Sequence, residues 1–463
     1  MSRHSVTTTE DPDYGPYASN RQGLPEKLFL LQRKLYRKAK DEAQFRFYAL
    51  YDRVYRLDVL WAAWNLVAAK AGCPGVDGVS IDHLASTSGR GGIEALIADL
   101  HEELRTKRYR PLPVKRTYIP KPQGGERPLG IPAVRDRIVQ MAVKLIVEPI
   151  FEADFCDGSY GFRPGRNQQD ALASAKEAIG RGDRLTVFDA DLQRYFDTVP
   201  HDILMRCLRK RIMDGRVLRL ITDWLRAPVV DEREGGPPRR PSSGTPQGGV
   251  LSPLLANVYL HWFDKLFQRS DGPATWANAR MIRYADDILI CARYISARLR
   301  QWIQHTLEDR MKLTLHPEKT RIIDLRQSGT RVDFLGFSLE RSASRYAGTP
   351  PYLRWSPSRK ALQRERDALR TLTDRRSRWM APRSLVQRVN EQLRGWWGYF
   401  GYGSCRLAAK DMTFMAAGRI YHSLRRRSQR PYRLPEGQTW YRHIHQELGL
   451  IRLVAPIRPT AMR

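Results

Sequence analysis

The chain has 463 residues, of which 42% are apolar, so it can bury a sizeable core and is not a disordered chain. Its 79 Lys and Arg residues against 49 Asp and Glu residues give a formal charge of +30, which indicates an anionic partner. No apolar run approaches the roughly 18 residues of a membrane span, and the polar N-terminus excludes a signal peptide. The five scattered cysteines argue against a zinc knuckle and a disulfide framework. We therefore expect a cytoplasmic protein with a polyanionic partner and no membrane contact.

The predicted elements change in character along the chain. Residues 1–25 hold Gly, Pro, Asn and Asp without periodicity, which is typical of a mobile arm. Residues 26–85 carry apolar side chains at helical spacing and predict a helical N-terminal extension. In residues 86–350 short apolar runs alternate with helical segments, which predicts an α+β domain. The strands expected there span residues 185–190, 281–284, 288–291, 320–325 and 332–339.

The C-terminal quarter of the chain is helical in pattern and strongly basic. Residues 351–463 contain 24 basic and 7 acidic residues. Residues 351–430 predict a helical domain, whose core we expect to contain Trp396 because an apolar stripe leads to it. That stripe consists of Leu385, Val389 and Leu393. Residues 431–463 predict a short basic tail, a candidate for a reduced DNA-binding region, and two of its histidines are expected at the surface, His443 and His445.

Three carboxylates stand where strands end or turn. The two apolar runs within residues 281–293 predict a β-hairpin, whose turn carries Asp286 and Asp287. Asp is common in turns for structural reasons alone, because it hydrogen-bonds its own backbone. However, the buried-looking strand before Asp191 also ends in acids, so the three side chains predict an acidic cluster. Such hard oxygen ligands suit Mg²⁺, and two Mg²⁺ ions would activate a 3′-hydroxyl and stabilise a leaving pyrophosphate. The pattern indicates a nucleotide polymerase.

Further blocks of sequence surround these carboxylates in a fixed order. They are Arg127-Pro-Leu-Gly-Ile-Pro132 with Arg135-Asp-Arg-Ile-Val-Gln140, Gly158-Ser-Tyr-Gly-Phe-Arg-Pro-Gly-Arg166, Gly244-Thr-Pro-Gln-Gly-Gly-Val-Leu-Ser-Pro253, Tyr284-Ala-Asp-Asp287, Leu315-His-Pro-Glu-Lys-Thr320, Phe334-Leu-Gly-Phe337 and Gly395-Trp-Trp-Gly-Tyr-Phe400. In this order the chain resembles the group II intron-encoded reverse transcriptases, or maturases, from about residue 121 to residue 400. The resemblance implies a right-hand polymerase with fingers and palm around an antiparallel sheet and an α-helical thumb, the maturase (X) domain.

The resemblance also implies roles for residues around the carboxylates. The metal ligands would be the three Asp side chains and the backbone carbonyl of Leu192, holding two Mg²⁺ ions for which Mn²⁺ can substitute. Phe196 would exclude a ribose 2′-hydroxyl, because a ring beneath the sugar leaves no room for another oxygen. The other residues expected to bind the nucleotide are Lys121, Arg127, Gln247 and Lys319.

Two groups of arginines are expected to bind RNA or DNA. Arg163 and Arg166 flank a compact Pro-Gly turn and suit contacts to template phosphates or sugars. A second group forms the strongest candidate for a phosphate-binding ridge, although a solvated charged face is the alternative. Its members are Arg425, Arg426, Arg427 and Arg430.

The function implied is that of an RNA-directed DNA polymerase that binds a structured group II intron RNA, assists its splicing and copies it into DNA during retrohoming. Its partners would be intron RNA, RNA template–DNA primer, target DNA and dNTPs, which would associate it with the bacterial nucleoid. Because only the tail follows the thumb, the chain resembles the endonuclease-lacking bacterial class. Two alternatives stay open: a free-standing enzyme of this family used in defence or DNA repair, and a splicing-only RNA-binding maturase. An RNA-dependent RNA polymerase is disfavoured by Phe196.

Overall fold

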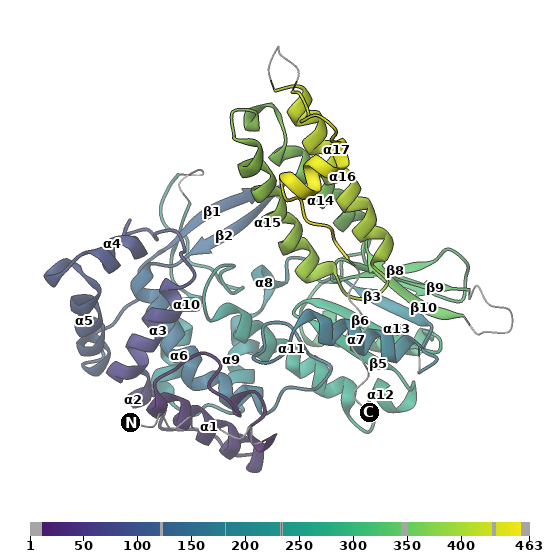
Figure 1. The fold of residues 1–463 in the computed structure, drawn as a ribbon. Helices are drawn as coiled ribbons and strands as arrows, with labels where there is room; N and C mark the ends of the chain where they lie inside the picture. Colours follow the sequence, from purple (N-terminus) through teal and green to yellow (C-terminus); the bar gives the residue numbers. More distant parts are fainter. Residues whose placement is uncertain are drawn as a thin grey trace, which may run out of the picture. The chain divides into compact units, whose positions relative to one another are not determined.

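The computed structural model describes residues 12–120, 124–180, 182–231, 233, 235–343, 351–427 and 432–454, and it mixes helices and strands as the predicted α+β class requires (Figure 1). The chain divides into two compact units. Unit 1 comprises Met1–Ala171, Ala190–Ile290 and Ile295–Arg321, and unit 2 comprises Leu172–Asp189, Cys291–Tyr294 and Ile322–Arg463. No helix in the described part of the chain is long and apolar enough to cross a membrane.

The helices of unit 1 surround α6 (Val134–Glu152), which is buried on nearly every side. Two N-terminal helices, α1 (Glu26–Asp41) and α3 (Leu57–Ala68), pack against it. Such an arrangement explains why α6 is apolar around most of its circumference. The other helices of unit 1 are α2 (Tyr51–Val54), α4 (Ile81–Ser86), α5 (Ile93–Arg105), α8 (Tyr195–Thr198), α9 (His201–Arg209), α10 (Gly215–Leu225), α11 (Ser252–Gln268), α12 (Pro273–Trp276) and α13 (Ala297–Gln304), with short helical turns η1 (Pro12–Tyr17), η2 (Gly89–Gly91) and η3 (His305–Arg310). Helix α7 (Gln168–Gly180) runs from unit 1 into unit 2.

The start of the described chain differs from the predicted mobile arm. From Pro12 the backbone forms η1, which packs against α1. The rings of Tyr17 and Tyr36 lie 5.5 Å apart, and the guanidinium of Arg33 lies 3.7 Å from the centre of the Tyr14 ring. These aromatic contacts give the segment an anchor that its Gly- and Pro-rich composition conceals. Residues 1–11 lie outside the described residues.

Unit 1 also contains a three-stranded sheet of order β2-β1-β4. Strand β1 (Val114–Pro120) pairs antiparallel with β2 (Glu126–Ile131) and parallel with β4 (Val229–Asp231). In this register Arg127 on β2 lies opposite Ile119 on β1. The sheet therefore fixes the position of the arginine that was predicted to bind the nucleotide.

A four-stranded sheet has the order β5-β6-β3-β7. Its strands are β3 (Thr186–Ala190), β5 (Arg280–Tyr284), β6 (Asp287–Ala292) and β7 (Arg321–Asp324), each within two residues of its predicted bounds. A turn of two residues, Ala285 and Asp286, joins β5 to β6, so the predicted hairpin is confirmed.

The segment expected to form one strand over residues 332–339 forms two. Strands β8 (Arg331–Phe334) and β9 (Phe337–Ser342) pair antiparallel, and β9 also pairs with β10 (Tyr352–Pro357). Leu335 and Gly336, between them, have φ of 49° and 79°. Two successive residues with positive φ make the tight turn that matches strand twist in a hairpin, so the chain reverses here. The apolar run concealed this turn, because Leu rarely adopts such a backbone conformation.

The helices of unit 2 form a bundle of α14 (Arg359–Leu372), α15 (Pro382–Phe400) and α16 (Arg406–Arg425), which pack on one another (Figure 1). A short turn, η4 (Arg375–Ser377), lies between the first two. The predicted stripe on α15 is buried, and Trp396 belongs to the core of this bundle, as expected.

Residues 432–454, the described part of the tail, pack on the bundle and are not a separate extension. Helical turns α17 (Trp440–Arg442) and η5 (His443–Glu447) place Ile444, Leu450 and Leu453 in the bundle core. His443, predicted at the surface, is only 5% exposed, and its ring bonds the Tyr432 hydroxyl at 2.9 Å. The prediction for His443 is therefore wrong, because its neighbour Ile444 and the following Leu450 and Leu453 pack into the bundle core. His445 is half-buried, with Nδ1 2.8 Å from the Leu450 carbonyl.

Candidate active site

Asp191 directly follows β3, and Asp286 lies in the β5–β6 turn. The charges of the two side chains interact. Burial raises the pKa of Asp286 above its ordinary value, and the negative charge of Asp191 raises it further. The positive charges of Arg127 and Arg283 act in the opposite direction. Burial is the larger of the two causes that raise the pKa, and the second is the response of a carboxyl group to a nearby carboxylate. The structure thus brings together two of the three predicted carboxylates.

Asp191 forms an ion pair with the side chain of Lys319. The Nζ atom of Lys319 lies 3.5 Å from Oδ2 of Asp191, and both side chains are partly exposed. The backbone supports this pairing, because His316 N donates to the Asp191 carbonyl at 2.8 Å. Gln193 N likewise donates to the Thr314 carbonyl at 2.8 Å. These two bonds form an isolated antiparallel bridge between Leu192 and Leu315. Neither bond uses the carbonyl of Leu192, a predicted metal ligand.

Asp287 does not complete a closed ligand group. It is the first residue of β6 and is exposed, whereas Asp286 is in the turn. Among the described residues no three His, Cys, Asp or Glu side chains gather closely enough to hold a metal ion. Mg²⁺ nevertheless needs only one or two protein carboxylates when substrate phosphates and water supply the remaining oxygens. The repulsion between Asp191 and Asp286, two hard oxygen donors, fits a divalent cation of this kind.

Phe196 lies beside the loop that carries Gln247. Its ring is half-buried and contacts the ring of fully buried Tyr195, with centroids 5.4 Å apart. Its carbonyl accepts a hydrogen bond from Thr245 N at 2.6 Å. The backbone of Phe196 is therefore tied to the loop, and its ring is only partly buried.

Glycines let this loop pass close to neighbouring backbone. Gly244 has φ +89°, and a Cβ there would lie 2.7 Å from the Asp197 carbonyl oxygen. Gly248 has φ +113°, and a Cβ there would lie 2.6 Å from the Gly130 carbonyl oxygen. Gly130 N in turn donates to the Gln247 carbonyl at 2.6 Å. Gln247 is thereby fixed to β2, the strand that carries exposed Arg127. Lys121, the other predicted triphosphate ligand, lies outside the described residues.

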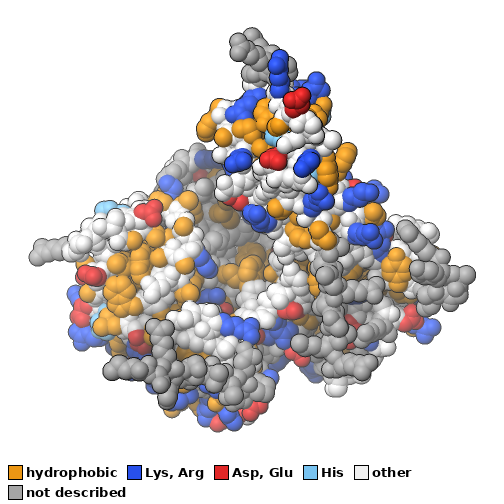
Figure 2. Space-filling view, viewed as in Figure 1, with side chains coloured by type: hydrophobic (Ala, Val, Ile, Leu, Met, Phe, Trp, Pro, Cys, Tyr) orange, Lys and Arg blue, Asp and Glu red, His pale blue; other side chains and the backbone are white. Residues whose placement is uncertain are grey.

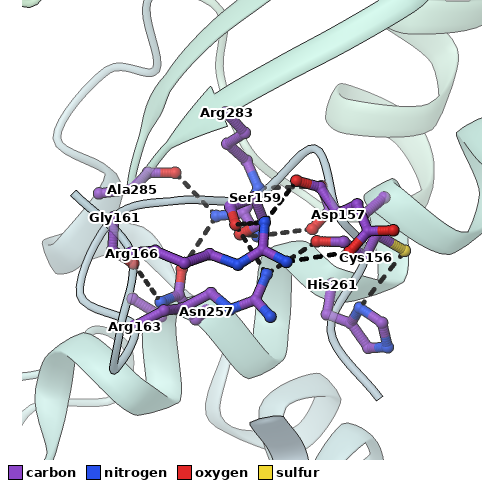
Figure 3. A network of polar contacts seen from close by, with 12 residues as sticks. Cys156, Asp157, Ser159, Gly161, Arg163, Arg166, Asn257, His261, Arg283 and Ala285 are labelled. Carbon is purple, nitrogen blue, oxygen red and sulfur yellow. Dashed lines mark hydrogen bonds and ion pairs between the residues drawn. The ribbon is translucent and has the colours of Figure 1, made fainter. Parts of the chain in front are cut away.

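Behind the turn lies a wholly buried arginine, Arg283 (Figure 3). It forms an ion pair with Asp264 on α11, whose side chain is also fully buried. It also bonds the hydroxyl of Ser159 at 2.7 Å and the carbonyl of Ala285, in the turn, at 2.9 Å. This strand was predicted from its apolar residues, and no role was predicted for Arg283. The available signal was a charged residue inside a strand expected to be buried, with Asn257 and Asp264 seven residues apart on one face of the next helix upstream.

Arg163 and Arg166, predicted to contact the template, bind protein groups in this region (Figure 3). Arg163 is 7% exposed and forms an ion pair with Glu152 at 2.7 Å. It also donates to the Ser159 carbonyl at 2.7 Å. Its predicted phosphate contact is corrected to an internal role, because its donors are used inside the protein. Arg166 is partly exposed and bonds Asp157 at 2.9 Å, so it orders the same loop.

The predicted arginine ridge lies at the end of α16. Arg425 and Arg426 are exposed, and Arg425 bonds the Tyr421 hydroxyl at 2.8 Å. Arg427 is half-buried and donates to the Met380 carbonyl, so it differs from its neighbours. Lys and Arg side chains gather over the helices of unit 2 in the view of Figure 2. Arg430 lies outside the described residues.

Two models of known protein families match this chain, each over a different range of residues. The family model described as "Reverse transcriptase (RNA-dependent DNA polymerase)" matches residues 119–339. The model described as "Group II intron, maturase-specific domain" matches residues 362–443. The first match contains Asp191, Asp286 and Phe196, and the second contains α15 and α16.

Curated relatives extend over most of the chain. It is 36% identical over 350 residues to Protein YkfC of Escherichia coli (strain K12), which covers 68% of this chain and 89% of that protein. It is 37% identical over 221 residues to the group II intron-encoded protein LtrA of Lactococcus lactis subsp. cremoris, covering 47% of this chain and 35% of LtrA. It is 27% identical over 339 residues to the putative COX1/OXI3 intron 1 protein of Saccharomyces cerevisiae, covering 61% of this chain and 38% of that protein. The chain thus spans little more than a third of these two intron proteins. It belongs to the family of group II intron-encoded reverse transcriptases and maturases.

Proposed function

We propose that this chain copies RNA into DNA and binds a structured group II intron RNA, whose splicing and retrohoming it assists. The observation that carries the proposal is the electrostatic interaction of Asp191 with Asp286, with half-buried Phe196 five residues after Asp191, within the part of the chain that matches reverse transcriptases. In this proposal residues 86–350 are the fingers and palm of a right-hand polymerase, and residues 351–430 are its thumb. The bundle core extends that thumb to Leu453.

We infer that Asp191 and Asp286 hold the catalytic Mg²⁺ ions, with Asp287 and the carbonyl of Leu192 as further ligands. Two bound Mg²⁺ ions would supply the charge that makes a primer 3′-hydroxyl a nucleophile and stabilises the leaving pyrophosphate. The protein's own contribution is to keep two mutually repelling carboxylates at one place. Burial is the largest cause of the raised pKa of Asp286, the charge of Asp191 raises it further, and a bound cation would offset both.

The remaining residues bind and select the nucleotide in this proposal. Arg127 faces the triphosphate with a fixed positive charge, and we assign Lys121 the same role from the sequence. Lys319, 3.5 Å from Asp191, is available to move to a phosphate once a metal ion neutralises that carboxylate. Phe196 lies under the sugar and excludes a 2′-hydroxyl, while Gln247 contacts the incoming nucleotide. The substrates are thus dNTPs on an RNA template with a DNA primer.

Replacing Asp286 with Asn should abolish primer extension on an RNA template while leaving RNA binding nearly intact. The change removes a charge that binds metal, but it keeps the size and most hydrogen bonds of the side chain. Extension is measured in single turnover with saturating primer–template. Asp309→Asn, an exposed carboxylate of the same unit, is the matched control and should extend normally. An Asp286 variant within about tenfold of the parent rate, a barrier change of only ~1.4 kcal/mol, would remove this residue from the mechanism.

Replacing Phe196 with Val should let the enzyme incorporate rNTPs, because the smaller side chain leaves room for the 2′-hydroxyl. The measurement is the ratio of kcat/KM for a dNTP to that for the matching rNTP. Phe267→Leu, at a fully buried ring of α11, should lower stability without changing this ratio. An unchanged ratio in the Phe196 variant would show that the ring has only a packing role.

Changing Arg425 and Arg426 together to Gln should flatten the salt dependence of RNA binding. If both neutralise phosphates, the slope of log K against log salt should fall by roughly 1.4–1.8 units, at about 0.7–0.9 per contact. Arg427 is left in place because it bonds the Met380 carbonyl. The control is Arg105→Gln with Arg206→Gln, which removes the same charge from exposed ion pairs of unit 1. Equal slopes for the parent and the Arg425 and Arg426 double variant would mean that these arginines face solvent.

A further inference from the structure

Arg283 is buried where a charge is costly. Its side chain is 0% exposed, as is that of its partner Asp264. A buried ion is tolerated only when it is paired and its hydrogen-bonding groups are satisfied. A strand residue that merely packs would be more stable as an apolar side chain. The retained charge therefore points to a geometric requirement at this position.

All five N–H donors of Arg283 have partners. Nε donates to Oδ1 of Asp264 at 2.9 Å, and Nη2 donates one of its hydrogens to Oδ2 of the same carboxylate at 2.5 Å. The other Nη2 donor goes to Ser159 Oγ at 2.7 Å. Nη1 bonds Oδ1 of Asn257 at 3.0 Å and the carbonyl of Ala285 at 2.9 Å. The planar fork of the guanidinium thus fixes four groups in one arrangement, which the point charge of a Lys cannot do.

One of those four groups is the carbonyl of Ala285 in the β5–β6 turn. The backbone of this residue has an uncommon conformation. Ala285 has φ +56°, in the left-handed region that non-glycine residues seldom occupy. Its carbonyl points to Arg283, and its neighbour in the chain is Asp286. Such a conformation persists only where the surroundings enforce it. The bond from Arg283 is one such constraint.

A second constraint acts on the other side of the turn. A Cβ at Gly161 would lie 2.4 Å from Ala285 N, so the loop of residues 158–161 packs directly on the turn. Asn257, the partner of Arg283, donates to the Gly161 carbonyl at 2.7 Å. Arg283 N also donates to the Gly158 carbonyl at 2.7 Å, and its own carbonyl accepts from Tyr160 N at 2.8 Å. Arg283 therefore holds both the turn and the loop that limits its movement.

We propose that Arg283 is a positioning residue for catalysis: through the Ala285 carbonyl it fixes the backbone that aims Asp286 at the reacting atoms. This inference rests on the proposed function, because it assigns Arg283 a role in the same site. Because its side chain is wholly buried, we assign Arg283 no direct contact with substrate or metal. Its loss should act through the turn, and misplacing a reacting group by about 1 Å can cost about 10²-fold in rate.

Two variants of Arg283 separate geometry from charge and from folding. Arg283→Lys keeps the positive charge but loses the fork. Arg283→Met with Asp264→Leu removes both ions together, so no unpaired charge stays buried and the fold should be retained. The matched control is Arg211→Lys. Arg211 is also buried and pairs with Asp154 at 3.0 Å, while donating to the Ala39 and Phe45 carbonyls.

Amide hydrogen exchange of peptides covering residues 280–292 is measured together with single-turnover primer extension. In both Arg283 variants we expect faster exchange in these peptides and a fall in extension rate of about 10²-fold, with unchanged primer–template affinity. Arg211→Lys should lower the melting temperature without either effect. Melting temperatures establish that each variant is folded.

The outcomes distinguish this inference from the proposed function. If the parent extends its primer, a folded Arg283 variant with the parent's extension rate overturns the inference, even when exchange in the turn is faster. If the parent extends no primer on RNA, the proposed function fails, and hydrogen exchange alone decides whether Arg283 orders the turn. Unchanged exchange in residues 280–292 then overturns the inference, and faster exchange supports only the part of it that concerns the order of the turn.

Discussion

Holding Asp191 and Asp286 together is the constraint on which the rest of the site depends. Burial of Asp286 and, to a smaller extent, the charge of Asp191 disfavour the ionised form of Asp286, so this carboxylate is under electrostatic strain. The protein offsets this strain with cations in different settings: exposed Arg127 on β2, Lys319 at 3.5 Å from Asp191, and buried Arg283. The chain as a whole carries a net charge of +30, and a divalent cation is the ligand that we propose for these carboxylates.

Several features of the fold and site could be predicted from the sequence because they depend on local pattern. The β5–β6 hairpin follows from two apolar runs around Tyr284-Ala-Asp-Asp287, and strand β3 follows from the run before Asp191. The buried stripe on α15 follows from helical periodicity, as does Trp396 in the bundle core. The family followed from the order of the blocks, which no single motif establishes. The metal-binding and nucleotide-binding roles stay predictions.

Other features could not be predicted because they depend on partners far apart in the sequence. A sequence shows that Arg163 is cationic, but only the fold shows that Glu152 and the Ser159 carbonyl occupy it. Arg283 meets Ser159 across 124 residues, and no periodicity records that contact. The tail was predicted to be a separate basic segment because its partners on the bundle are distant in sequence, yet Leu450 and Leu453 belong to the bundle core. The turn at Leu335 depends on a backbone conformation that its residue type disfavours.

The central claim, that Asp191 is a ligand of a catalytic metal ion, is tested most directly by changing the ligand atom. In Asp191→Cys a thiolate replaces the carboxylate oxygens, and soft sulfur ligands favour softer metals than Mg²⁺. Primer extension on an RNA template is measured with Mg²⁺, Mn²⁺ and Cd²⁺, relative to the parent with each metal, and Asp191→Ala serves as control. We predict that the Cys variant is inactive with Mg²⁺ and regains extension with Mn²⁺ or Cd²⁺, while the Ala variant regains none. Full activity of the Cys variant with Mg²⁺, or an equal loss with every metal, would contradict the account.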